Sequence, residues 1–195
     1  MICGVLLAAG SASRFGSNKL LYPLPDGTPI GIAAARHLKQ SVEHVIAVVR
    51  PDDKVLTHLL HAEGVSTIVP ESLGKGMSDS LVSAIRTTKD AEGWLISLAD
   101  MPWIKPQTIT KLALMLEEGA EIAVPYYGEQ RGHPVGFSQQ FLPDLLGLGG
   151  DKGASELLRR YSDSVDIFQS DDAGIVQDID RPRDVLAKSE FMTQL

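Results

Sequence analysis

The feature that most constrains the fold of this 195-residue chain is the alternation of short apolar runs with helix-like apolar stripes. The apolar runs cover residues 2–8, 45–49, 67–69, 94–99 and 122–124. Between them, apolar residues spaced three and four apart form stripes, as at Ile109, Leu112, Ala113 and Leu116. Strands that alternate with helices predict βαβ units with right-handed crossovers. We therefore expect a single α/β domain over residues 1–195, with three layers and a doubly wound, mainly parallel sheet.

Composition narrows the class of protein further. Hydrophobic residues make up 44% of the chain and charged residues 22%, which is typical of a globular protein. No apolar run approaches the roughly 18 residues that span a bilayer, and no signal-peptide pattern precedes the first run. Cys3 is the single cysteine, which excludes an internal disulfide and a cysteine metal cluster. We expect a cytoplasmic protein. Its net charge of −7 argues against a nucleic-acid partner, and the absence of a long block of Lys and Arg argues against a polybasic membrane patch.

The first apolar run ends in a segment rich in glycine and serine. Residues 7–19 read Leu-Ala-Ala-Gly-Ser-Ala-Ser-Arg-Phe-Gly-Ser-Asn-Lys. This segment follows a buried strand, so it lies at the edge of the sheet where α/β proteins bind ligands. Small residues let backbone N–H groups approach an anion, and Arg14 and Lys19 supply positive charge. The pattern predicts a triphosphate-binding loop, but an ordinary Gly/Ser connection with two solvated basic residues fits the composition equally well.

Two acidic positions are candidate metal ligands. Asp100 follows the most apolar run, where a carboxylate is costly unless it is solvated or paired. Mg²⁺ prefers oxygen ligands and commonly joins one or two carboxylates to substrate phosphates. Asp178 and Asp180 alternate with apolar residues and so project on the same side of an extended segment. We prefer Asp180 as the second ligand, although Asp100 and Asp180 could each instead cap a helix, in the second case one that begins at Pro182.

Two further segments are candidate contacts for a small molecule. Residues 76–81 read Gly-Met-Ser-Asp-Ser-Leu and join a short strand to a helix, where free N–H groups are expected. Ser78 and Ser80 offer hydroxyl groups there, and the alternative is that Ser78 simply caps the helix. His133 lies between a glycine and a proline, and a turn histidine bonded to the backbone is an equally good interpretation. The other histidines are expected on helices or their ends, without a third zinc ligand.

These motifs resemble those of the nucleotidyltransferases, and within that superfamily those of the molybdenum cofactor cytidylyltransferases. The matches are Leu-Ala-Ala-Gly-x-Ser-x-Arg-Phe-Gly-x-x-Lys at 7–19, Gly-Met-Ser-x-Ser-Leu at 76–81, Leu-Ala-Asp-Met-Pro at 98–102, Gly-His-Pro-Val-Gly-Phe at 132–137 and Gly-Asp-Lys-Gly-Ala at 150–154. The chain departs from the family at Arg181 and Arg183, where relatives have threonine and glutamate. It also has Ser155 in place of an arginine, while Lys152 remains a candidate anion contact.

The resemblance implies a Rossmann-like nucleotidyltransferase fold that transfers CMP from CTP to the terminal phosphate of molybdopterin and releases pyrophosphate. It implies Arg14, Lys19 and Asp100 as catalytic residues, with Mg²⁺ held by Asp100 and Asp180. The residues that it implies for binding the nucleotide or the acceptor are Leu7, Ala8, Ala9, Gly10, Ser11, Arg14, Lys19, Gly76, Met77, Ser78, Ser80 and His133. It also suggests handover of the product to a molybdenum enzyme or its chaperone.

The choice of nucleotide depends on one residue of the first loop. Guanylyl-transferring relatives have Leu-Ala-Gly-Gly, whereas this chain has Leu-Ala-Ala-Gly at residues 7–10. We expect the methyl group of Ala9 to fill space beside the base and so disfavour a purine. The alternatives are a guanylyl- or other nucleotidyltransferase that acts on a small phosphorylated acceptor, or a non-catalytic protein that binds a nucleotide or a pterin.

Overall fold

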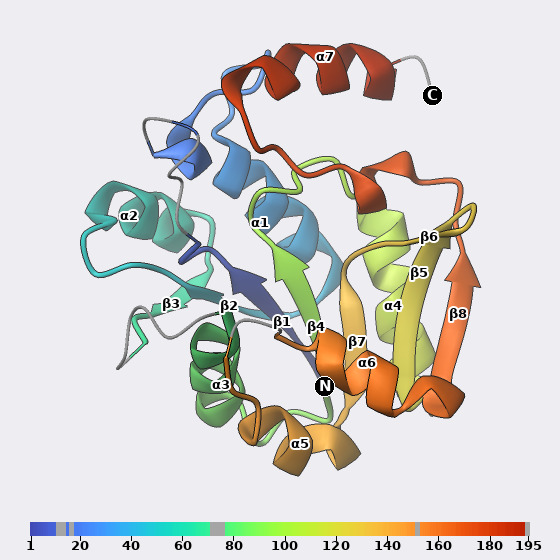
Figure 1. Cartoon of the computed structure of the whole chain (residues 1–195). Coiled ribbons are helices and arrows are strands. Elements are labelled where there is room, and N and C mark those ends of the chain that lie inside the picture. Colours follow the sequence, from blue (N-terminus) through green and yellow to red (C-terminus); the bar gives the residue numbers. More distant parts are fainter. Residues whose placement is uncertain (11–14, 16–17, 71–76, 151–152, 194–195) are drawn as a thin grey trace.

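The computed structural model describes residues 1–10, 15, 18–70, 77–150 and 153–193. Its described strands form one eight-stranded sheet in the order β3-β2-β1-β4-β7-β5-β6, with β8 paired to β5 (Figure 1). The strands are β1 (Ile2–Leu7), β2 (His44–Val48), β3 (Ser66–Ile68), β4 (Gly93–Leu98), β5 (Ile122–Tyr127), β6 (Gln130–Arg131), β7 (Val135–Ser138) and β8 (Val165–Gln169). Each apolar run of the sequence therefore forms a strand.

The sheet is mostly parallel, as predicted. Strand β1 is parallel to both β2 and β4, β3 is parallel to β2, and β8 is parallel to β5. Strands β6 and β7 are the exceptions, because β7 lies antiparallel between β4 and β5, and β6 is antiparallel to β5. The fold is thus the expected three-layer α/β architecture, with antiparallel strands in one half of the sheet.

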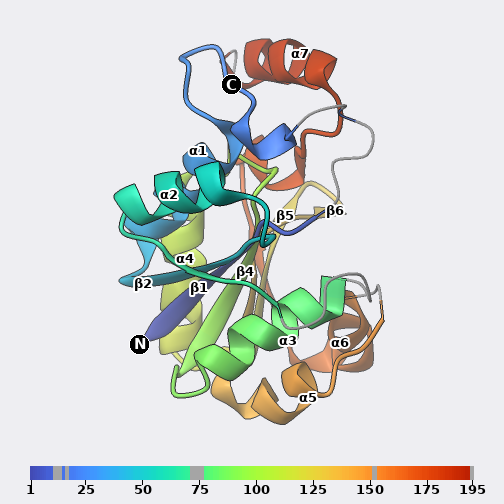
Figure 2. The same cartoon turned by 90° about the vertical axis from the view of Figure 1, so that its left-hand side faces the viewer.

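Helices cover both faces of the sheet (Figure 2). One face carries α1 (Ile30–Ser41), α2 (Lys54–Ala62) and α4 (Pro106–Glu117), and the other carries α3 (Met77–Thr87), α5 (Leu142–Leu146) and α6 (Ser155–Arg160). Helix α7 (Pro182–Thr193) packs on the first side through Val185. Short 3₁₀ helices are η1 (Lys19–Leu21), η2 (Gln139–Phe141), η3 (Ser162–Ser164) and η4 (Ala173–Val176). None of the helices among these residues is long and apolar enough to cross a membrane.

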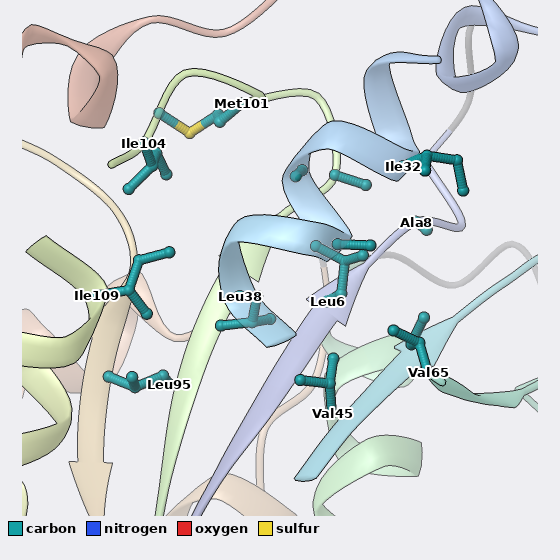
Figure 3. Packing of buried hydrophobic residues seen from close by; sticks show 14 of the residues in the cluster. Leu6, Ala8, Ile32, Leu38, Val45, Val65, Leu95, Met101, Ile104 and Ile109 are labelled. Atoms are coloured by element: carbon teal, nitrogen blue, oxygen red, sulfur yellow. The ribbon is translucent and has the colours of Figure 1, made fainter. Parts of the chain in front are cut away.

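The core follows from the alternation of side chains along the central strands. Leu6 and Ala8 of the β1 segment pack with Leu38 of α1 and Val45 of β2 on one face (Figure 3). Cys3 and Val5 point to the opposite face, where Leu81 of α3 is buried. Burial raises the pKa of the Cys3 thiol to about 11, so that thiol stays protonated at neutral pH.

Two ends of the expected helical stripes differ from the prediction. Val55 of α2 and Met77 of α3 are exposed, although both are expected on the buried stripes of their helices. His44 also differs, since it is the first residue of strand β2 rather than part of a helix. The remaining stripe residues of α2, α3 and α4 are buried or packed against the core.

Strands β1 and β4 end side by side, and this fixes where a ligand site can form. Leu7 pairs with Leu98 at the last register position, and the Ala99 N–H donates a hydrogen bond to the Leu7 carbonyl at 3.1 Å. The segments that follow both strands therefore leave the sheet at the same edge. Figure 1 shows both strands pointing toward the end of the molecule where η1 and α7 lie.

Candidate active site

A cluster of one lysine and two aspartates lies at this edge of the sheet. The Lys19 ammonium donates a hydrogen bond to Oδ2 of Asp100 at 2.8 Å, and its Nζ lies 4.0 Å from Oδ1 of Asp180. The exposed fractions of the three side chains are 15%, 25% and 51%, so the ion pair with Asp100 is partly shielded from water. Residues 81 positions apart in the sequence thus meet at one point.

Lys19 is positioned by its neighbours in η1. Oδ1 of Asn18 accepts a hydrogen bond from the Leu20 N–H at 3.3 Å and caps this 3₁₀ helix, while its side-chain amide donates to Asp53. Leu20 is buried against α1, where a Cβ on Gly31 would approach the Leu20 Cβ within 3.1 Å. The glycine therefore allows η1 to lie close to α1, and this fixes the backbone from which Lys19 extends.

A backbone hydrogen bond links the segments that carry the two aspartates. The Ile179 N–H donates a hydrogen bond to the Asp100 carbonyl at 2.9 Å, and the Ile179 side chain is fully buried. Asp180 follows directly, so its distance from Asp100 is set by a buried anchor rather than by a free loop. The side chain of Asp180 is half exposed and remains accessible to a ligand.

The structure separates the roles of Asp178 and Asp180. Asp178 pairs with Lys188 of α7, whose Nζ lies 3.5 Å from Oδ1 and also contacts the Asp178 carbonyl. Asp184 accepts hydrogen bonds from the N–H groups of Asp180 and Arg181, at 3.0 and 2.8 Å. Asp184 therefore caps the helix that begins at Pro182, as carboxylates in a first helical turn often do. The carboxylate of Asp180 instead lies near Lys19.

A buried carboxylate that sequence reasoning missed holds these segments together. Asp172 is 1% exposed, and its Oδ2 accepts hydrogen bonds from the Lys105 N–H and the Thr108 hydroxyl, both at 2.8 Å. Its Oδ1 accepts from the Gly174 N–H at 3.0 Å. Asp172 thus clamps the chain that follows Asp100 to the chain that precedes Asp180. The aspartate-to-glycine spacing of two residues is the sequence signal of such a turn.

His133 belongs to a segment that is hydrogen-bonded to η4, and the charge of Asp100 acts on its side chain. Its N–H donates a hydrogen bond to the Ile175 carbonyl at 2.9 Å, and a Cβ on Gly132 would lie 2.5 Å from the Ile175 Cγ1. Burial lowers the pKa of His133, the charge of Arg131 lowers it further, and the charge of Asp100 acts in the opposite direction. The imidazole is therefore neutral at pH 7. Its Nδ1 is buried without a hydrogen-bond partner among the described residues.

The first turn of α3 contacts Gly150 and Gly153 through Ser78. Ser78 is fully buried, and its Oγ accepts a hydrogen bond from the Gly153 N–H at 3.2 Å, while its own N–H donates to the Gly150 carbonyl at 3.3 Å. Helix α3 begins at Met77, so the alternative that Ser78 is its cap is wrong. Ser80 is partly buried and Met77 is exposed. Ser78 thus links the start of α3 to Gly150 and Gly153.

The described part of the first loop is open to solvent on one side. Ala9 packs partly against the cluster that contains α3, and Gly10 is exposed, with open space where a Cβ would stand. Leu7 is partly buried and Ala8 is buried. Ser11, Arg14, Gly76 and Lys152 lie outside the described residues.

The donor set of the cluster fits a hard divalent cation. Within the described ranges, no group of three or more histidine, cysteine, aspartate or glutamate side chains could hold a metal ion on its own. Asp100 and Asp180 nevertheless present two carboxylates to the same positive charge. Two carboxylates completed by substrate phosphates and water are a common ligand set for Mg²⁺.

Comparison with known families decides the class of protein. A family model described as the MobA-like NTP transferase domain matches residues 4–165. The chain belongs to the MobA-like NTP transferase family. This membership confirms the nucleotidyltransferase superfamily that the motifs indicated. The matched range includes most of β1, all of β4 and the segments that follow these strands.

Individual relatives of this MobA-like chain come from several families. It is 30% identical over 193 residues to the purine catabolism protein PucB of Bacillus subtilis (strain 168), a match that covers 94% of this chain and 93% of PucB. It is 22% identical over 192 residues to the molybdenum cofactor cytidylyltransferase of Escherichia coli (strain K12), a match that covers 98% of this chain and 97% of that relative. Among solved structures, Rv0371c of Mycobacterium tuberculosis H37Rv in complex with manganese has a TM-score of 0.80 at 26% identity, with 100% and 99% covered. The resemblance is therefore established at the level of the family.

Proposed function

We propose that this protein transfers CMP from CTP to the terminal phosphate of a molybdopterin-type acceptor and releases pyrophosphate. The observation that carries the proposal is the meeting of Lys19, Asp100 and Asp180 where β1 and β4 end. In open α/β sheets this edge is where ligands bind. Membership of the MobA-like NTP transferase family supports a nucleoside triphosphate as the donor.

The reaction needs no protein nucleophile. An oxygen of the acceptor phosphate attacks the α-phosphorus of CTP, a new P–O bond forms, and the bond to the β-phosphate oxygen breaks as pyrophosphate leaves. Positioning and charge neutralisation provide most of the acceleration in such transfers. Bound Mg²⁺ would neutralise phosphate charge at Asp100 and Asp180. Lys19 and Arg14 would offset the charge of the triphosphate and of the leaving group.

The positions of the remaining residues suggest a role for each of them in binding the substrates. The backbone of Ala8, Ala9 and Gly10 would approach the phosphates, because the space at Gly10 is open. Ala9 packs on the face that carries α3, so the base would lie between Ala9 and the start of that helix. His133 is neutral and lies near Asp100, where it would contact the acceptor without adding charge.

Two relatives bear on the choice of substrate. The Escherichia coli relative is named for cytidylyl transfer to the molybdenum cofactor and is similar over nearly its whole length. PucB is more similar in sequence, and its name refers to purine catabolism. The name of the Escherichia coli relative supports CTP and a molybdenum cofactor acceptor, whereas the name of PucB refers to purine catabolism alone.

The test is a nucleotide panel. The protein is incubated with molybdopterin, Mg²⁺ and each labelled triphosphate in turn, and pyrophosphate release is measured. We expect turnover with CTP and little with GTP. Turnover with GTP alone would replace cytidylyl by guanylyl transfer, and binding without pyrophosphate release from any triphosphate would indicate a non-catalytic protein.

A matched pair of variants tests the site itself. Asp100→Asn should lower turnover by at least about a hundredfold, since a metal ligand contributes several kcal/mol of transition-state stabilisation. Asp178→Asn makes the same change on a carboxylate that pairs with Lys188 instead, and should cost far less. Near-normal turnover of Asp100→Asn would exclude Asp100 as the ligand.

A further inference from the structure

Lys19 occupies the space that a cation shared by the two aspartates would need. Its Nζ lies 2.8 Å from Oδ2 of Asp100 and 4.0 Å from Oδ1 of Asp180, so one ammonium group serves both carboxylates. A divalent ion that binds both oxygens must sit between them at about 2.0–2.1 Å for Mg²⁺. An ammonium and a divalent ion repel each other strongly at such separations. Lys19 and the metal therefore cannot both hold this position.

We propose that Lys19 is an internal counterion that competes with the metal in the nucleotide-free protein and moves to the triphosphate when the metal binds. The proposal rests on the proposed function, because it takes Asp100 and Asp180 as the metal ligands. It adds a second role for Lys19, namely lowering the affinity of the site for free metal. Metal and nucleotide then bind cooperatively. The metal displaces the Lys19 ammonium from the two aspartates, and the phosphates of the nucleotide bind that ammonium and leave the aspartates free for the metal.

The way the residue is held suits such an exchange. Its backbone is fixed by the Asn18 cap and by the buried Leu20, so movement is confined to the side chain. Lysine carries a compact charge on a flexible four-carbon stem and makes no bidentate fork with a carboxylate. The ammonium can therefore leave Asp100 for a phosphate without any change of the fold.

The partners of the two acidic segments make the effect specific to Lys19. Lys188 also lies beside an acidic group, but its Nζ pairs with Asp178 and with the Asp178 carbonyl. Removing Lys188 takes away one nearby positive charge without freeing Asp100 or Asp180. It is therefore the matched control for the general effect of charge on metal affinity.

The experiment is a titration of Mn²⁺ alone, with no nucleotide present, in which free Mn²⁺ is followed by electron paramagnetic resonance. Lys19→Met should tighten Mn²⁺ binding about two- to fivefold, the range expected when a partly exposed ion pair no longer competes. Lys19→Arg keeps the charge and should bind no more tightly than the natural protein. Lys188→Met should change the affinity less than twofold. In a parallel titration with CTP, Lys19→Met should weaken binding, so the same substitution acts with opposite signs on the two ligands.

The outcomes separate this proposal from the function on which it rests. Asp100→Asn should weaken Mn²⁺ binding about tenfold or more, and an unchanged affinity would remove the metal site and both proposals. If Asp100→Asn weakens binding but Lys19→Met does not tighten it, only the counterion role is overturned. Equal tightening by Lys19→Met and Lys188→Met would also overturn it, because a general charge effect would then suffice. Lys19→Gln serves as a second neutral variant if Lys19→Met does not fold.

Discussion

Replacing Asp172 by asparagine should destabilise the protein strongly, although the residue lies outside the proposed chemistry. The carboxylate is 1% exposed and accepts hydrogen bonds from the Lys105 N–H, the Thr108 hydroxyl and the Gly174 N–H. An asparagine keeps one oxygen, so its NH₂ group must face at least one of these donors. The clamp between the chain after Asp100 and the chain before Asp180 is then partly broken.

The size of the effect follows from these bonds. A hydrogen bond to a charged group contributes about 1.5–3 kcal/mol, and a buried donor left without a partner costs about 1–3 kcal/mol. We expect Asp172→Asn to lower the free energy of unfolding by about 2–4 kcal/mol. For a chain of this size, 1 kcal/mol corresponds to a Tm shift of about 2–4 °C, so Tm should fall by roughly 4–16 °C.

Urea denaturation followed by circular dichroism measures this change. Asp171→Asn is the matched control, because Asp171 is the exposed neighbour and its substitution should stay within about 0.5 kcal/mol. Equal midpoints for the two variants would refute the idea that Asp172 holds the two segments together.

Two further predictions concern the base and the pH dependence of stability. Ala9→Gly should relax the preference for CTP over GTP in competitive binding, and an unchanged ratio would show that the Ala9 methyl group does not select the base. Burial lowers the pKa of His37 and of His133 in the folded protein. As the pH falls below about 6.5, the unfolded chain therefore binds more protons than the folded protein does. Stability should therefore fall on acidification through that range, and His37→Gln should reduce the slope of unfolding free energy against pH.

The parts of the fold that could be predicted are those whose signal is local. Strands β1, β2, β4 and β5 are buried and therefore read as continuous apolar runs, and helices α2, α3 and α4 show clear stripes. Strand β7 could not be found this way, because it has four residues and its antiparallel place depends on pairing with β4 and β5. Strand β8 includes an aspartate and lies at the edge of the sheet, so it has little apolar signal.

The candidate site likewise has features that the sequence could predict and features that it could not. Asp100 could be predicted because a carboxylate directly after a buried strand is unusual, and Lys19 because a basic residue ends the glycine-rich loop. Their direct ion pair could not be predicted, since it joins segments far apart in the sequence. Asp172 was missed because a buried aspartate looks like a surface residue until its partners are known. The preference for Asp180 over Asp178 stays a prediction, which the pairing of Asp178 with Lys188 supports.

A crystal structure with CTP and Mn²⁺, with data collected at the manganese absorption edge, tests the central claim most directly. We expect an anomalous peak between the carboxylates of Asp100 and Asp180, with Nζ of Lys19 moved from Asp100 onto a phosphate oxygen. A manganese ion bound elsewhere, with the Lys19–Asp100 ion pair intact beside the bound nucleotide, would contradict both the proposed site and the exchange.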